Sequence, residues 1–138
     1  MLKAKLLHPE ILGVLGGSGH GGKILIADGN YPFNTRANPS ARRVYLNLAP
    51  GLVTVTQVLE ALLTAMPVEA AEVMMTDSGE EPEIYADFRR LLPGLELTTY
   101  NRFAFYDQCM DRDVCLVIAT GEQRLYANIL LTIGVVKP

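Results

Sequence analysis

The chain carries GGSGHGG at residues 16–22, followed immediately by KILIAD at residues 23–28. The second stretch is apolar and rich in β-branched side chains, which predicts a strand buried in a sheet. It ends on Asp28, at the position from which side chains in open α/β sheets reach ligands. The first stretch is a loop in which glycines surround His20, one of only two histidines. Such an imidazole packs poorly but can reach a ligand and move protons near neutral pH, so we expect acid–base chemistry at His20.

Apolar helices and strands alternate along the rest of the chain. Pro9 suits the first turn of a short helix that ends at Gly16, Thr54 and Gln57 have the spacing of a capping box, and Asn101 can cap another helix. The segment 34–43 has the composition of an irregular loop. Further helices are predicted at residues 54–66, 82–92 and 101–111, and strands at 44–48, 68–75, 95–100, 114–119 and 126–136.

This alternation predicts an α/β fold, a three-layer α/β/α sandwich with a largely parallel sheet. The 138 residues suffice for one core, and no repeat or linker divides them, so we expect a single domain over residues 1–138.

Composition argues against several classes of partner. The net charge is −3 and no basic stripe is present, so nucleic-acid binding is not expected. No apolar run approaches the ~20 residues of a membrane span, and the N-terminal residues lack a signal-peptide core, so we expect a cytoplasmic protein. Cys109 and Cys115 match neither a redox pair nor a zinc site and are expected to be reduced and packed.

Each candidate site residue has a structural alternative. Gly17, Gly19 and Gly22 have the spacing of a dinucleotide fingerprint, but they follow a helix and precede a strand, the reverse of the order that motif needs. His20 could belong to a simple helix-to-strand turn. Asp28 could equally bond the main chain of the following turn.

Polar groups also accompany two later segments. Arg102 falls in the first turn of a predicted helix, where a cation opposes the helix dipole, so either it has a partner elsewhere or it is an exposed, screened arginine. Phe103 and Tyr106 are then expected in the core. Residues 120–122 and 126–128 bracket a turn and could serve the main chain alone. No metal site is expected, because neither histidine has a ligand spacing.

These segments together resemble the D-ribose pyranase and L-fucose mutarotase family over nearly the whole chain. The matching pieces are GHG at 19–21, IAD at 26–28 with Pro32, NRFAFY at 101–106, TGE at 120–122, and YANILL at 126–131 with GV at 134–135. The resemblance implies an α/β fold, cofactor-free interconversion of sugar anomers or ring forms, and ring-like homo-oligomers, a decamer among them, with sites near subunit contacts.

The resemblance also implies roles for single residues. The catalytic histidine is His20, and monosaccharide binding falls on Asp28, Arg102, and the segment Tyr126, Ala127 and Asn128. Arg102 and its neighbours favour the fucose branch over ribose. Two positions depart from the pattern. Gly22 stands where the family usually has an aspartate that could orient the histidine, and Asn30 where the fucose branch tends to have histidine.

Mutarotation requires only proton transfer, so no cofactor is implied. We expect His20 to shuttle the proton, Asp28 and Asn128 to hold sugar hydroxyls, Arg102 to donate hydrogen bonds, and Tyr126 to contact the sugar. The main alternative is a non-catalytic monosaccharide-binding or sugar-transport accessory protein. A nucleotide-binding module is a weaker third hypothesis.

Overall fold

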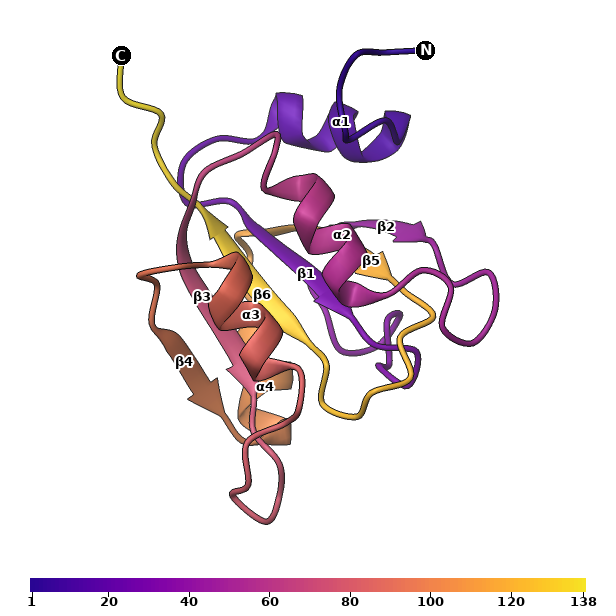
Figure 1. Cartoon of the computed structure of the whole chain (residues 1–138), viewed down its shortest axis with the longest axis vertical. Helices are drawn as coiled ribbons and strands as arrows, with labels where there is room; N and C mark the ends of the chain where they lie inside the picture. The colour runs from indigo at the N-terminus through magenta and orange to yellow at the C-terminus, as the bar shows by residue number, and fades with distance from the viewer.

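A computed structural model describes all 138 residues. The chain forms four helices and six strands (Figure 1). The helices are α1 (Pro9–Gly17), α2 (Val55–Leu62), α3 (Tyr85–Leu91) and α4 (Arg102–Cys109). The strands are β1 (Lys23–Ala27), β2 (Arg42–Tyr45), β3 (Val68–Met74), β4 (Leu97–Tyr100), β5 (Val114–Ala119) and β6 (Ile129–Ile133).

The strands form one mixed sheet in the order β2-β5-β1-β6-β3-β4. The pairs β2–β5, β1–β5 and β3–β4 are parallel, whereas β6 lies antiparallel between β1 and β3. The predicted sheet is therefore confirmed as largely parallel, with β6 as the one reversed strand. The carboxyl ends of β1, β3 and β4 thus lie at the same edge as the start of β6.

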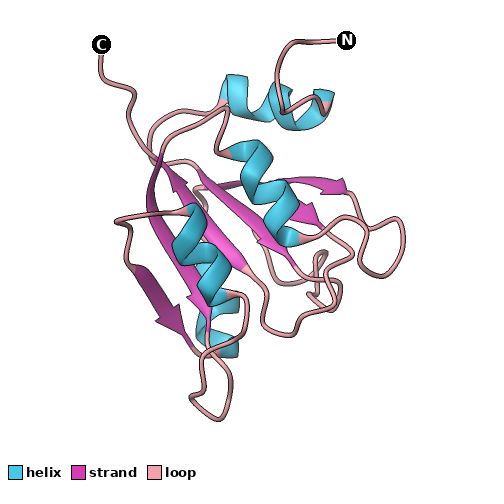
Figure 2. Ribbon diagram, viewed as in Figure 1, coloured by secondary structure: helices cyan, strands magenta, loops and turns pink.

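Helices cover both faces of the sheet, as the predicted three-layer sandwich requires. In Figure 2, α2 and α3 lie in front of the sheet and α4 lies behind it. Leu59 and Phe88 pack with Ile24 and Ile129 in the larger core on the first face. Phe105 packs with Leu25, Val117 and Leu130 on the second face. The strands carry apolar side chains on both faces for this reason.

The predicted helix starts are confirmed by their capping contacts. Pro9 occupies the start of α1, and Thr54 and Gln57 make both hydrogen bonds of a capping box at α2. The Asn101 side chain accepts from the main-chain N–H of Ala104 at 2.9 Å. These local contacts satisfy N–H groups that the first turn of a helix leaves unpaired.

Three expectations about local structure are wrong. The last strand runs from Ile129 to Ile133 rather than over 126–136, and it cannot include Tyr126, which has φ 60°, a left-handed conformation. β2 begins at Arg42, within the segment expected to be a loop, because it pairs with β5. Phe103 is 68% exposed rather than part of the core, since Phe105 and Cys109, four residues apart, form the buried face of α4.

No helix combines the length and apolar character needed to cross a membrane. Cys109 and Cys115 are both free, Cys109 buried and Cys115 partly exposed.

Candidate functional site

A cavity of about 390 Å³ opens where β1, β3 and β4 end and β6 begins. In open α/β sheets this edge, where strand order and direction change, is the usual place for a ligand. Four of the residues predicted from the sequence line it, together with aromatic and apolar neighbours. The lining residues are Asp28, Asn30, Tyr31, Met74, Arg102, Tyr106, Leu125, Tyr126 and Asn128.

Asp28 and Asn128 form a buried pair at the base of this cavity. The Asn128 Nδ2 atom donates to Asp28 Oδ2 at 3.0 Å, and the main-chain N–H of Asp28 donates to Asn128 Oδ1 at 2.8 Å. Asp28 Oδ1 also accepts from the main-chain N–H of Asn30 at 2.9 Å. The turn-stabilising contact considered for Asp28 is therefore present, and the same carboxylate also lines the cavity.

Burial raises the pKa of Asp28 above its ordinary value, although hydrogen bonds from Asn30 and Asn128 oppose the shift. Carboxyl groups with a raised pKa inside a cavity are common at functional sites. Asp28 can accept hydrogen bonds from a neutral polar ligand while its position is fixed by Asn128.

Arg102 has the partner that its place in the first turn of α4 suggested. Its Nη2 atom donates to Asp77 Oδ2 at 2.9 Å and to the Tyr126 hydroxyl at 3.1 Å. The Tyr126 hydroxyl in turn donates to the same Asp77 oxygen at 3.3 Å. The Arg102 guanidinium also lies 5.8 Å from the centre of the Tyr126 ring. Side chains from two loops and a helix are thus joined at one wall of the cavity.

Tyr126 keeps its left-handed main chain although a side chain disfavours that conformation. Such conformations cost of order 1–3 kcal/mol and occur where surrounding contacts hold them. Ala127, which follows, is fully buried against the core and does not line the cavity. The turn at Tyr126 therefore brings its ring to the cavity while Ala127 anchors the segment.

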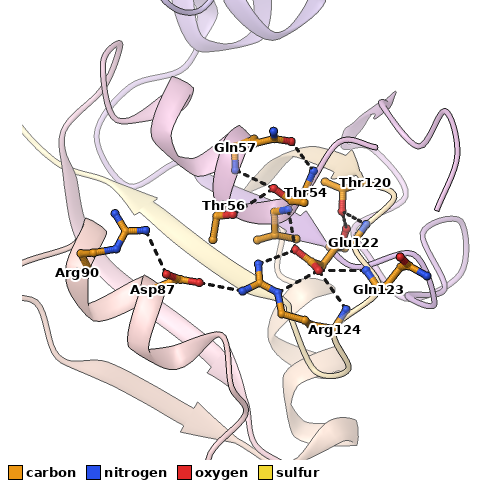
Figure 3. A network of polar contacts seen from close by, with 11 residues as sticks. Thr54, Thr56, Gln57, Asp87, Arg90, Thr120, Glu122, Gln123 and Arg124 are labelled. Carbon is orange, nitrogen blue, oxygen red and sulfur yellow. Dashed lines mark hydrogen bonds and ion pairs between the residues drawn. The ribbon is translucent and has the colours of Figure 1, made fainter. Parts of the chain in front are cut away.

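The loop between β5 and β6 is held by a network of polar contacts (Figure 3). Glu122, only 4% exposed, accepts from Arg124 Nε at 3.1 Å and from Arg124 Nη2 at 2.9 Å. Glu122 also accepts from the main-chain N–H of Val55, at the start of α2. Arg124 donates onward to Asp87 of α3 at 2.8 Å. Two helices thus hold the loop that carries Tyr126.

Burial alone would raise the pKa of Glu122, but the hydrogen bonds from Arg124 outweigh it and hold that pKa below its ordinary value. The carboxylate is therefore structural. It serves the main chain and Arg124, as the structural alternative for residues 120–122 proposed.

Aromatic rings form a second wall of the cavity. Tyr31 and Tyr106 meet edge to face with their ring centres 5.4 Å apart, and the Tyr31 hydroxyl donates to the carbonyl oxygen of Arg36 at 2.6 Å. Tyr106 was expected in the core, but one side of it faces this cavity. A small site with a few polar groups set among aromatic side chains suits a neutral organic ligand.

His20 lies at the opposite edge of the sheet. The main-chain N–H of Gly21 donates to the carbonyl oxygen of Ile133, so the loop meets β6 where that strand ends, as the ribbon also shows (Figure 1). Five strand residues separate this loop from Asp28, about 16 Å at the ordinary rise. Within one chain, His20 does not reach the cavity.

His20 pairs there with Glu69, at the start of β3. Its Nε2 atom lies 2.9 Å from both carboxylate oxygens, and the two side chains are 58% and 44% exposed. Because a carboxylate only accepts, Nε2 must carry the hydrogen, which leaves Nδ1 as an acceptor in neutral imidazole. Glu69 thus holds His20 in place, although Gly22 stands where the family usually has an aspartate that could orient the histidine.

Glu69 and Asp77 could not be identified as site residues from the sequence. Glu69 is 49 residues from His20 in sequence, and Asp77 is 25 residues from Arg102. Only the sheet order brings these residues together. The unexplained cation in the first turn of α4 was the single local signal of an acidic partner.

Comparisons with known proteins agree with this architecture. Residues 1–136 match the model of the RbsD / FucU transport protein family. The chain is 34% identical over 135 residues to the D-ribose pyranase of Symbiobacterium thermophilum, covering 98% of each chain. It is also 34% identical over 148 residues to the fucose mutarotase of Bos taurus, covering 96% of this chain and 92% of that one.

Two solved structures have the same fold. The fucose mutarotase of Streptococcus pneumoniae in complex with L-fucose matches with a TM-score of 0.84 and 29% identity, over 99% of this chain and 100% of that one. The Bacillus subtilis RbsD complexed with D-ribose matches with a TM-score of 0.85 and 27% identity, over the same shares. The two branches are equally similar to this chain, so the expected closeness to the fucose branch is not resolved. The chain belongs to the RbsD/FucU family of sugar pyranases and mutarotases.

Proposed function

We propose that this protein is a cofactor-free monosaccharide mutarotase or pyranase that binds its sugar in the cavity beside Asp28. The observation that carries the proposal is the arrangement of Asp28, Asn128, Arg102 and Tyr126 around about 390 Å³. That volume lies near the lower end of the ~300–1,000 Å³ usual for small-molecule sites. It suits a ligand of one ring.

The reaction needs two proton transfers. A base takes the proton of the anomeric hydroxyl, the bond between the anomeric carbon and the ring oxygen breaks, and an acid protonates that oxygen. The open-chain aldehyde then rotates and recloses with the roles reversed. Closure through a different hydroxyl changes the ring form. Positioned acid–base groups contribute about 10²–10⁴-fold to such a step.

Roles follow from the contacts of each residue. Asp28 and Asn128 accept from and donate to sugar hydroxyls at the base of the cavity. Arg102 donates N–H groups that its contacts with Asp77 and Tyr126 leave free. Tyr126 offers its ring and its hydroxyl oxygen.

His20 supplies the proton transfer in this proposal, from a second copy of the chain. It is too far from the cavity of its own chain, but it is exposed, fixed by Glu69 and carried on a loop at the surface. Two exposed apolar side chains form a rim at one side of the cavity, as an interface would require. Leu125 is 65% exposed, and Phe103, 68% exposed, packs on Tyr106. A ring-like homo-oligomer would bring this rim and a neighbouring His20 together.

A fucose-like sugar is the proposed substrate. The segment NRFAFY at 101–106, which is similar to the fucose branch, places Arg102 in the wall of the cavity. Asn30 also lines the cavity, where that branch tends to have histidine, so the preference for fucose over ribose is expected to be moderate.

Anomer exchange measured by NMR tests the proposal. Saturation of one anomer of L-fucose, D-ribose or D-galactose should transfer to the other faster with enzyme than without, and most strongly for L-fucose. A protein that binds these sugars without accelerating exchange would overturn it.

The second candidate is a non-catalytic monosaccharide-binding protein. The separation of His20 from the cavity within one chain is the observation that favours it. The same measurement separates the two functions, because a binding protein broadens or shifts sugar resonances but leaves the exchange rate at its value in buffer.

A further inference from the structure

Asp77 lies on the loop at residues 75–84, which joins β3 to α3, and touches the sugar-facing wall from outside. It does not line the cavity, and its side chain is 69% exposed. Its Oδ2 atom nevertheless accepts from both Arg102 and Tyr126, at 2.9 and 3.3 Å. A single oxygen therefore joins two residues of the cavity wall that come from different elements.

The contact with Asp77 determines which hydrogen-bonding groups of Tyr126 and Arg102 remain available to a ligand. A tyrosine hydroxyl has one hydrogen, and that of Tyr126 goes to Asp77. The Tyr126 oxygen then also accepts from Arg102 Nη2, and it retains capacity only as an acceptor. Arg102 uses Nη2 for both contacts and keeps the hydrogens on Nε and Nη1. The wall thus presents an acceptor at Tyr126 and donors at Arg102.

Without Asp77, neither the orientation of the Tyr126 hydroxyl nor that of the Arg102 guanidinium would be fixed. The hydroxyl of Tyr126 could rotate and offer its hydrogen to the cavity, and Arg102, 41% exposed, could extend into solvent. An arginine side chain loses rotamer entropy when it is held in one position. A sugar would have to supply that ordering itself when it binds.

We propose that Asp77 is a positioning and specificity-determining residue of the sugar site, which orients the Tyr126 hydroxyl and the Arg102 guanidinium toward a neutral sugar. The inference rests on the proposed function and deepens it. Asp77 touches no reacting atom, so it acts on sugar binding, and the proton transfer at His20 proceeds as before.

The test compares Asp77→Ala and Asp77→Asn with a matched control, Glu80→Gln. This control substitution removes one charge from the same loop. It leaves the hydrogen bonds of Glu80 in place, because these are made by its main-chain N–H and carbonyl groups. Asp77→Ala should raise KM for L-fucose about threefold to tenfold, as expected for losing about 0.7–1.4 kcal/mol of ordered hydrogen bonding. The value of kcat should stay within about twofold. Asp77→Asn, which can still accept, should fall between wild type and Asp77→Ala.

Salt provides an independent readout. The sugar is uncharged, so its binding has no other strong reason to depend on ionic strength. Because the Arg102–Asp77 pair is exposed and therefore screened, KM of the wild type should rise between low salt and about 0.5 M sodium chloride. KM of Asp77→Ala should stay constant.

Three results would contradict the inference. If both Asp77 variants match Glu80→Gln in KM and salt response, Asp77 has no role, and the proposed function stands. If kcat and melting temperature fall together with a rise in KM in both variants, Asp77 is structural instead. If the wild type neither binds sugar nor accelerates exchange, the proposed function fails and this inference with it.

Discussion

Asp28 uses both of its carboxylate oxygens, one for the turn at Asn30 and one for Asn128. Asp28→Asn keeps the first contact, but its new amide faces the Nδ2 donor of Asn128. We expect a loss of about 1 kcal/mol of stability from that mismatch. Sugar affinity should fall about tenfold or more, because a carboxylate is the stronger acceptor for hydroxyl groups. Thermal melting and calorimetric titration measure the two effects.

The double variant Asp28→Asn with Asn128→Asp separates these roles. It exchanges donor and acceptor within the pair, so stability should return toward wild type. The carboxylate then stands at position 128 instead of position 28, and the affinity for sugar should remain low. Affinity that returns together with stability would mean that Asp28 serves the fold alone.

His20 makes one side-chain contact, with Glu69, and both partners are exposed. Exposed ion pairs contribute about 0–1 kcal/mol, so His20→Ala should melt close to the wild-type temperature. Accelerated anomer exchange should be lost. His8→Asn is the control: it removes the other histidine but keeps a side chain that can cap α1. Undiminished exchange in His20→Ala would exclude His20 from the mechanism.

Helix starts were predictable at the element scale because their signals are local. Pro9, Thr54 with Gln57, and Asn101 act within one turn of their own helix. The start of the last strand was not predictable, since the left-handed conformation of Tyr126 keeps the strand from beginning there. The antiparallel direction of β6 depends on how two distant halves of the sheet meet, and no local pattern encodes it.

The loop before β6 depends on Glu122 for its anchorage to α2 and Arg124. Glu122→Gln should lower the free energy of unfolding by about 2 kcal/mol, because hydrogen bonds to a charged group lose strength and Arg124 loses a buried partner. Glu81→Gln, which breaks a solvent-exposed pair with Arg89, should change stability much less than Glu122→Gln does, because solvent screens exposed pairs. Equal losses in the two variants would contradict the structural role given to Glu122.

The pH dependence of stability gives a second check on Glu122. Its pKa in the folded state lies below the ordinary 4.5, so its contribution is complete above pH 4.5 and is lost as pH falls through the lower folded value. Urea unfolding of the wild type from pH 6 to pH 3 should therefore lose more stability than that of Glu122→Gln. Parallel curves for the two proteins would contradict this account.

At the scale of the whole molecule, the candidate site is divided between opposite edges of one sheet. Residues 126–128, Asp28 and Arg102 could be identified from their resemblance to a family, and the fold brings all but Ala127 to one cavity. The separation of His20 from that cavity could not be deduced from the chain, because it depends on how β1, β3 and β6 align in the sheet. Glu69 and Asp77 were missed for a similar reason: their contacts depend on strand order.

The central claim is that His20 of one copy acts on a sugar held by Asp28 of another, and subunit complementation tests it directly. His20→Ala and Asp28→Ala proteins, each with little activity, are unfolded together, refolded as a mixture and assayed for L-fucose anomer exchange. Light scattering should first show an assembly several times the 15.1 kDa chain mass. Random mixing pairs an intact cavity with an intact His20 at roughly a quarter of sites, half times half, so exchange should recover toward that fraction of wild type. Mixtures no more active than the separate variants would contradict the claim.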